Sequence, residues 1–167
     1  MEYPMISMID KNLYTNKNKF LLEYVIAHET AHQWWYGTVG NDEVNEPWID
    51  EALTEYSTIL YFEKRYGKEY LDRLIENMEA QSRSYSDENI FKPSSQYKNS
   101  TEYSLNVYTR GAVLFHKIRE EVGDKVFFDV LKDYYKTYKF KNVNGTQFVE
   151  LWKKNGVDIE KIIGKNK

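Results

Sequence analysis

The chain has 167 residues, of which 41% are hydrophobic and 16% aromatic, so its length and composition suit one globular domain with a substantial core. A net charge of −3 excludes the strongly basic surface of a nucleic-acid-binding protein. The chain has no cysteine, which excludes disulfides and thiolate metal sites. Any bound metal must therefore use histidine and carboxylate ligands.

The sequence contains no segment that predicts membrane insertion or export. No apolar run approaches the roughly 20 residues that a membrane-spanning helix needs. The opening Met1-Glu2-Tyr3-Pro4 is acidic and is not followed by an apolar core, so no signal peptide is expected in this chain. These features favour the cytoplasm without fixing the compartment.

Hydrophobic periodicity predicts a mainly helical domain with one short strand region near the N-terminus. Residues 5–9 suit a strand, and a polar, turn-rich loop follows at 10–18. The predicted helices cover residues 19–36, 48–66, 68–83, 106–122, 124–138 and 144 or 146 to 154, with a short segment at 158–163. The aperiodic stretch 84–101 is predicted to be a loop, and loops of that length are often functional.

The motif His28-Glu29-Thr30-Ala31-His32 lies in the first predicted helix. Residues four apart on a helix share a face, so His28 and His32 can direct ring nitrogens at one metal ion. Glu29 need not bind the metal and can instead take a proton from a water that the metal activates. This pattern is typical of zinc hydrolases. A helical histidine pair on a surface or in a core would give the same spacing.

A catalytic zinc site needs a third protein ligand and an open fourth position. The segment Trp48-Ile49-Asp50-Glu51-Ala52, at the start of the second predicted helix, offers two carboxylates. The residues alone leave both Asp50 and Glu51 open as the third ligand.

The stretch from 28 to 56 resembles the aminopeptidase N family of gluzincin zinc metallopeptidases, whose catalytic domain is thermolysin-like. In that family eighteen residues separate His-Glu-x-x-His from a glutamate ligand, and residues 33–50 fill this gap here. The words around the motifs are similar too, since His-Gln-Trp-Trp and Trp-Ile-Asp-Glu-Ala resemble the family's His-Gln-Trp-Phe and Trp-Leu-Asn-Glu-Gly. The resemblance implies that Glu51, and not Asp50, is the third zinc ligand.

The segment Tyr108-Thr109-Arg110-Gly111-Ala112 resembles the family's Tyr-Glu-Lys-Gly segment. The resemblance implies that Tyr108 stabilises the tetrahedral intermediate. A phenol that donates a hydrogen bond to the oxyanion as it forms binds the transition state better than the substrate. Tyr103 is a second candidate for this role. The chain has 15 tyrosines, and a core position is the alternative for either of them.

Met1-Glu2 is similar to the Met-Glu of the family's Gly-x-Met-Glu-Asn motif, in which the glutamate receives the α-amino group of the substrate. The resemblance implies that Glu2 binds substrate and that the protein is an aminopeptidase. Two departures weaken this match, because no glycine precedes Met1 and Tyr3 stands in place of Asn. A terminal glutamate without such a role is the alternative.

Five other positions complete the site hypothesis. Glu55 lies four residues after Glu51 and can hydrogen-bond the far nitrogen of a ligand histidine, although a solvent-facing glutamate fits equally. His116 has no ligand-spaced partner and is expected to be a packed or surface histidine. The tryptophans are expected to pack the two metal-bearing helices rather than contact substrate, and they are Trp34, Trp35 and Trp48.

The resemblance covers nearly the whole chain and implies one domain, residues 1–167, which is the helical lobe of a thermolysin-like (gluzincin) catalytic domain. It implies one Zn²⁺ ion as cofactor, a peptide as substrate and the remaining domains of a longer parent chain as partners. The expected function is zinc-dependent removal of N-terminal residues from peptides. Two alternatives stay open. One is a thermolysin-like zinc endopeptidase, and the other is a non-catalytic, zinc-stabilised binding module derived from a peptidase.

Overall fold

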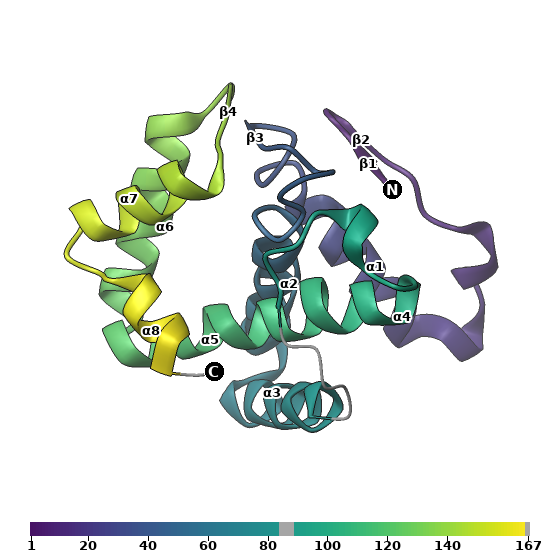
Figure 1. Cartoon of the computed structure of the whole chain (residues 1–167). Helices are drawn as coiled ribbons and strands as arrows, with labels where there is room; N and C mark the ends of the chain where they lie inside the picture. Colours follow the sequence, from purple (N-terminus) through teal and green to yellow (C-terminus); the bar gives the residue numbers. More distant parts are fainter. Residues whose placement is uncertain (84–88, 166–167) are drawn as a thin grey trace.

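The computed structural model describes residues 1–83 and 89–165 and has a mainly helical architecture (Figure 1). Residues 84–88 of the predicted loop 84–101 lie outside the described part. Within the described ranges, no helix is long and apolar enough to cross a membrane. The helices are α1 (Lys19–Ala31), α2 (Glu51–Tyr66), α3 (Lys68–Ser82), α4 (Ser100–Tyr103), a π-helix (Ser104–Arg110), α5 (Gly111–Val122), α6 (Asp124–Tyr138), α7 (Gly145–Lys154) and α8 (Ile159–Lys165). Single 3-10 turns occur at Lys11–Leu13, Asn16–Asn18 and Ser94–Gln96.

Helix α2 lies at the centre of the structure, with α1, α3, α5 and the π-helix packed around it. Its residues Ala52, Leu53, Tyr56 and Ile59 are completely buried. Figure 1 shows α6, α7 and α8 on one side of α2 and α1 on the other. Aromatic side chains fill the core between α2 and the later helices, namely Tyr56, Phe115, Phe127, Tyr134, Phe148 and Trp152. This packing fixes α2, and α2 in turn carries part of the functional site.

The later helices follow the predicted boundaries closely. Helix α6 spans the predicted residues, and α3 ends one residue earlier than expected. Helix α7 begins after Asn144, whose side chain accepts a hydrogen bond from the Gln147 backbone N–H while the Gln147 side chain accepts one from the Asn144 N–H. This reciprocal capping box selects Asn144 over Thr146 as the cap.

The N-terminal strand prediction was wrong in its extent. The structure has a short antiparallel hairpin of β1 (Glu2–Tyr3) and β2 (Ile6–Ser7), because Met5 adopts a left-handed φ of 68° and the chain turns back. The sequence did not predict a second, parallel pair, β3 (Val39–Gly40) with β4 (Lys141–Asn142). Such a pair joins segments far apart in the chain, so local periodicity carries no signal for it.

Helix α1 ends five residues earlier than predicted, at Ala31 rather than at Tyr36. After His32 the chain closes a compact turn in which Gly37 N–H donates to the His32 carbonyl at 2.8 Å. Tyr36 adopts a φ of 112°, which no residue of a right-handed helix has. Helix α2 likewise starts at Glu51 instead of residue 48, after a turn in which Glu51 N–H donates to the Pro47 carbonyl at 3.1 Å.

The helix predicted at 106–122 begins earlier and is not uniform. Asn99 caps α4 by accepting a hydrogen bond from the Glu102 N–H at 2.9 Å, so the helical segment starts at Ser100. A π-helix then follows, in which the Gly111 N–H bonds to the Asn106 carbonyl five residues back. Tyr108 lies in this π-helix, which is a conformation often found at functional sites.

Gly111 lies where α5 crosses α2. A Cβ atom at this position would lie 2.3 Å from Ala52 Cβ and 3.2 Å from Ala52 Cα. Only glycine permits this approach of the two backbones. Because Ala52 follows Glu51 and Gly111 follows the π-helix, this contact also brings Glu51 and Tyr108 together.

We expect Gly111→Ala to destabilise the fold by about 1–3 kcal/mol, because the added methyl overlaps Ala52. This loss exceeds the helix-propensity gain of roughly 1 kcal/mol at most. The free energy of unfolding in urea measures the effect. Adding Ala52→Gly should recover part of the loss, since it removes the closest overlapping atom. Unchanged or raised stability in Gly111→Ala would contradict the described packing.

Candidate active site

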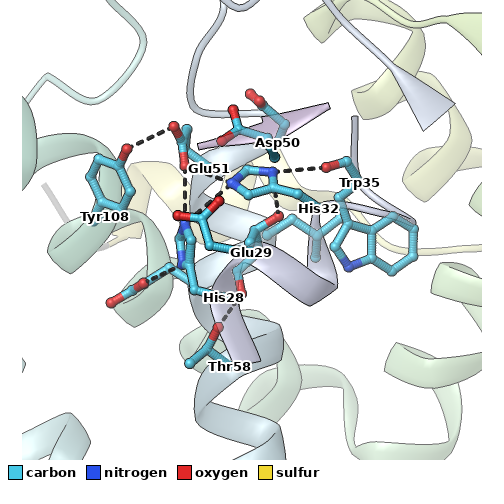
Figure 2. A network of polar contacts seen from close by, with 12 residues as sticks. His28, Glu29, His32, Trp35, Asp50, Glu51, Thr58 and Tyr108 are labelled. Atoms are coloured by element: carbon cyan, nitrogen blue, oxygen red, sulfur yellow. Dashed lines mark hydrogen bonds and ion pairs between the residues drawn. The ribbon is translucent and has the colours of Figure 1, made fainter. Parts of the chain in front are cut away.

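Three electron-pair donors from the end of α1 and the start of α2 converge (Figure 2). His28 lies in the last turn of α1, His32 directly follows it, and Glu51 is the first residue of α2. The two Nε2 atoms are 3.2 Å apart, and they lie 3.3 Å and 3.2 Å from Glu51 Oε2. In the described part of the chain, these side chains are the one group of this kind placed to hold a metal ion.

The outer hydrogen bonds of the two histidines define their tautomers. His28 Nδ1 lies 2.9 Å from Glu55 Oε2, and His32 Nδ1 lies 3.1 Å from the Trp35 carbonyl oxygen. A carboxylate and a carbonyl can only accept, so each Nδ1 carries a proton. In the neutral imidazoles, both Nε2 lone pairs then point into the cluster.

This donor set fits zinc. Two Nε2 lone pairs and a carboxylate oxygen at 3.2–3.3 Å repel one another unless a proton or a metal cation lies between them. Tetrahedral zinc with ligand distances of about 2.0–2.1 Å would space its donors by about 3.3–3.4 Å. The observed spacing therefore matches one face of a zinc tetrahedron, and His₂Glu is a ligand set of catalytic zinc.

Charge and burial act in opposite directions on these groups. Burial lowers the pKa of His28, but hydrogen bonds and charges from Glu51 and Glu55 outweigh it and raise that pKa to about 10. Burial also opposes the charged form of His32, and Glu51 again raises the pKa overall. Burial raises the pKa of Glu51, while hydrogen bonds from both histidines lower it to about 2. In the metal-free chain the cluster therefore holds protons where a cation would bind.

The structure brings Glu51, and not Asp50, to the two histidines. Asp50 is buried and accepts a hydrogen bond from Asn41 Nδ2 at 2.9 Å. Burial, followed by the charge of Glu51, raises the pKa of Asp50 to about 7. In Figure 2 its carboxylate points away from the two imidazoles.

Tyr108 and Tyr103 approach the cluster from the π-helix and α4. The Tyr108 hydroxyl donates to Glu51 Oε1 at 2.7 Å. Burial and the negative charge of Glu51 raise the pKa of Tyr108 far above its usual value, so the hydroxyl keeps its proton. The Tyr103 ring packs edge-on against Tyr108, with centroids 5.8 Å apart. Tyr108 is thus the tyrosine in direct contact with a candidate ligand.

Two further carboxylates lie near the donors. Glu29 is buried, and Figure 2 shows its side chain on the same side of α1 as the two imidazoles. Glu2 on β1 interacts electrostatically with His32, Glu51 and Glu29, and burial is the largest cause of its raised pKa. The amino group of Met1 lies 2.8 Å from Glu29 Oε2 and 3.6 Å from Glu2 Oε2.

Sequence reasoning missed three groups behind the ligands. The Trp35 carbonyl has no sequence signal, because any residue supplies a carbonyl. The Thr54 hydroxyl lies 3.3 Å from His32 Nδ1, and the Tyr24 hydroxyl donates to Glu55. Helical spacing offered a signal for the last two, since Thr54 follows Glu51 by three residues and Tyr24 precedes His28 by four.

The tryptophan predictions were correct only in part. Trp35 joins the end of α1 to α2 through its indole N–H, which donates to Ser57 Oγ at 2.9 Å. Trp48 is buried, but its ring packs edge-on against Phe91 and Phe148 instead of lying between α1 and α2. Trp34 is 49% exposed, which contradicts a packing role, because it lies beyond the end of α1.

His116 is a packed histidine, which is one of the two expected outcomes. It is buried in α5, and its Nδ1 lies 3.1 Å from the Tyr56 hydroxyl. Burial is the largest cause of its lowered pKa. His116 thus serves the core and lies outside the candidate ligand set.

Comparisons with known proteins identify related sequences. The family model for the peptidase family M1 domain matches residues 3–165. Human aminopeptidase Q is 23% identical over 145 residues, which cover 82% of this chain and 14% of that protein. Human endoplasmic reticulum aminopeptidase 2 is 24% identical over 151 residues, 87% of this chain and 15% of that protein. Aminopeptidase N of Lactococcus lactis subsp. lactis is 26% identical over 136 residues, 77% of this chain and 16% of that protein.

The fold is also similar to solved structures. An M1 zinc metallopeptidase from Deinococcus radiodurans superposes with a TM-score of 0.72 at 24% identity, covering 84% of this chain and 31% of that chain. The chain spans about 15% of the length of the curated relatives. The family match nevertheless covers nearly all of it. We conclude that the chain belongs to peptidase family M1, with the fold of the helical lobe of that catalytic domain.

Proposed function

We propose that this chain is a partial catalytic domain that hydrolyses peptide bonds with zinc and removes residues from the N-terminus of peptides. His28, His32 and Glu51 hold one zinc ion. Glu29 is the general base and then the general acid, Tyr108 assists the oxyanion, and the remaining domains of a longer protein complete the cleft. The observation that carries the proposal is the convergence of three acceptor atoms at 3.2–3.3 Å.

The chemistry divides between zinc and the side chains around it. Zinc bound by three protein ligands lowers the pKa of a water ligand from 15.7 to about 7. Glu29 follows His28 directly, so its carboxylate can accept a proton near the ligands without occupying a ligand position. The same carboxyl then returns this proton to the leaving nitrogen. The nitrogen can therefore depart as a neutral amine and not as a strongly basic anion.

Tyr108 contributes a hydrogen bond that becomes stronger as the reaction proceeds. Its raised pKa keeps the phenol protonated and able to donate. Its donor now pairs with Glu51 Oε1 and can turn to a developing oxyanion. A donor of this kind stabilises the transition state more than the substrate, so its loss lowers kcat.

Glu2 supports the assignment as an aminopeptidase. Its side chain is largely buried and interacts electrostatically with His32, Glu51 and Glu29, so it lies close to the proposed zinc ligands. A buried carboxylate there suits the α-ammonium group of a peptide. Anchoring that ammonium would leave the first peptide bond at the zinc.

Separate substitutions distinguish the metal ligands from the general base. His28→Ala with His32→Ala should abolish stoichiometric zinc binding, measured by metal analysis after dialysis. Glu29→Gln should keep zinc but reduce turnover by about 10²–10⁴-fold. Turnover is measured in this chain and in any longer protein that contains it. His116→Ala is the matched control and should keep both properties. Zinc retained by the double variant would refute the ligand assignment.

The metal-free chain should lose stability over a pH range in which the zinc-bound chain does not. The folded pKa of His28 is about 10, against about 6.5 when unfolded. Its contribution to the stability of the metal-free chain is therefore complete below about pH 6.5 and is lost as pH rises towards 10. Zinc competes with these protons, so the stabilisation by zinc should grow over the same range.

Urea midpoints measured from pH 6 to 10, with zinc and with a chelator, test this difference. The His28→Ala, His32→Ala double variant is the reference, because it removes the site and leaves other titrating groups in place. A metal-free chain that gains stability relative to this reference as pH rises would contradict the prediction.

Substrate blocking tests the aminopeptidase assignment. Peptides with a free amino terminus should be cleaved with about 10–150-fold higher kcat/KM than N-acetylated ones, because a charge-assisted hydrogen bond to Glu2 contributes about 1.5–3 kcal/mol. Glu2→Gln should remove most of this preference, whereas Glu69→Gln on the exposed face of α3 should not. Equal cleavage of blocked peptides would favour an endopeptidase. Zinc binding without turnover, in this chain and in a longer protein that contains it, would favour the non-catalytic module.

A further inference from the structure

The turn that ends α1 contains the most strained backbone near the site. Tyr36 has a φ of 112°, a conformation that favours glycine over a residue with a bulky side chain. Backbone outliers of this kind persist only where the surrounding structure determines them, and they cluster at functional sites. The strain at Tyr36 therefore calls for a structural reason.

The carbonyl groups of residues 32–34 are bonded within the turn. The His32 carbonyl accepts from the Gly37 N–H at 2.8 Å, and the Trp34 carbonyl accepts from the Val39 N–H at 3.0 Å. The Gln33 carbonyl accepts from the Thr38 hydroxyl at 2.8 Å. These bonds hold the turn in one conformation and can hold Tyr36 at an unfavourable φ.

The Trp35 carbonyl differs from its neighbours because it is bonded to the candidate metal site. It accepts from His32 Nδ1 at 3.1 Å, while the N–H of the same peptide unit, on Tyr36, donates to the Val39 carbonyl at 2.8 Å. A peptide unit is planar, so these two bonds fix its orientation together. The φ of Tyr36 sets how this plane lies against the residues that follow. A negative φ would turn the plane away from its partners.

We infer that the left-handed turn at Tyr36 is a positioning device for His32. It points the Trp35 carbonyl at His32 Nδ1, which keeps the proton on Nδ1 and the Nε2 lone pair directed at the cluster. Tyr36 is thus a positioning residue that acts through its backbone. This inference rests on the proposed function in so far as zinc is the ion that His32 binds.

Substitutions at Tyr36 separate the backbone from the side chain. Glycine adopts the left-handed φ readily, whereas valine is β-branched and resists it. Tyr36→Gly and Tyr36→Phe should therefore bind zinc with a Kd within about twofold of that of the parent. The reason is that Tyr36 orients His32 through the peptide plane and not through its own side chain. Tyr36→Val should bind zinc about 10–100-fold more weakly. Competition with a chromophoric chelator measures the zinc Kd.

A matched control separates this effect from general loss of stability. Leu151 lies in α7 and is buried in the core. Leu151→Ala should lower the stability of the fold and leave the zinc Kd unchanged. Equal weakening of zinc binding in Leu151→Ala and Tyr36→Val would overturn the inference. So would an unchanged Kd in Tyr36→Val, or a Kd in Tyr36→Gly as weak as that of Tyr36→Val.

A readout without metal keeps the two proposals distinguishable. The proton on His32 Nδ1, bonded to the Trp35 carbonyl, should give a slowly exchanging NMR resonance in the metal-free parent and in Tyr36→Gly. Tyr36→Val should lose it. A parent chain that binds no zinc would refute the proposed function, while this resonance would still decide the inference. Retention of the resonance in Tyr36→Val would overturn it.

Discussion

His28 Nε2, His32 Nε2 and Glu51 Oε2 lie 3.2–3.3 Å from one another, and much of the surrounding structure holds them in place. Each donor is fixed from behind. The Glu55 carboxylate accepts from one imidazole, and a backbone carbonyl accepts from the other. The Tyr108 phenol donates to Glu51, the third donor. Because α2 is enclosed by other helices, these partners cannot easily withdraw. The proposed metal site is therefore preorganised by the fold, which lowers the energy needed to bind an ion.

Those parts of the site that depend on helical spacing could be predicted from the sequence. The pair His28 and His32 follows from the repeat of an α-helix, and the resemblance to a known family singled out Glu51. The Trp35 carbonyl could not be predicted, because a backbone group leaves no trace in the residue type. The φ of Tyr36 was equally hidden, since a tyrosine gives no signal for a left-handed conformation. Both depend on the tertiary structure of the turn.

The boundaries of the elements show the same division. Helices α3 and α6 each begin directly after a glycine, and their predicted limits were nearly correct. The C-terminal end of α1 and the start of α2 were predicted wrongly, because hydrogen bonds across the turn shape the chain there and not propensity. The parallel pair β3–β4 was missed since its strands lie about a hundred residues apart. Local patterns predicted the elements, whereas long-range contacts decided their limits.

The π-helix at Ser104–Arg110 has a consequence for how this part of the chain can vary. A π-turn contains about one residue more than an α-turn, and each residue of an α-helix advances by about 100°. The extra residue therefore rotates everything after it relative to α4. Glu102 before the π-helix is buried, and Gly111 after it is close-packed. An α-helix without the extra residue would turn these two positions towards different directions. Relatives that differ by one residue here can keep both faces buried only by exchanging π for α geometry, so an alignment gap at this point would mark a change of helix type and not a loop.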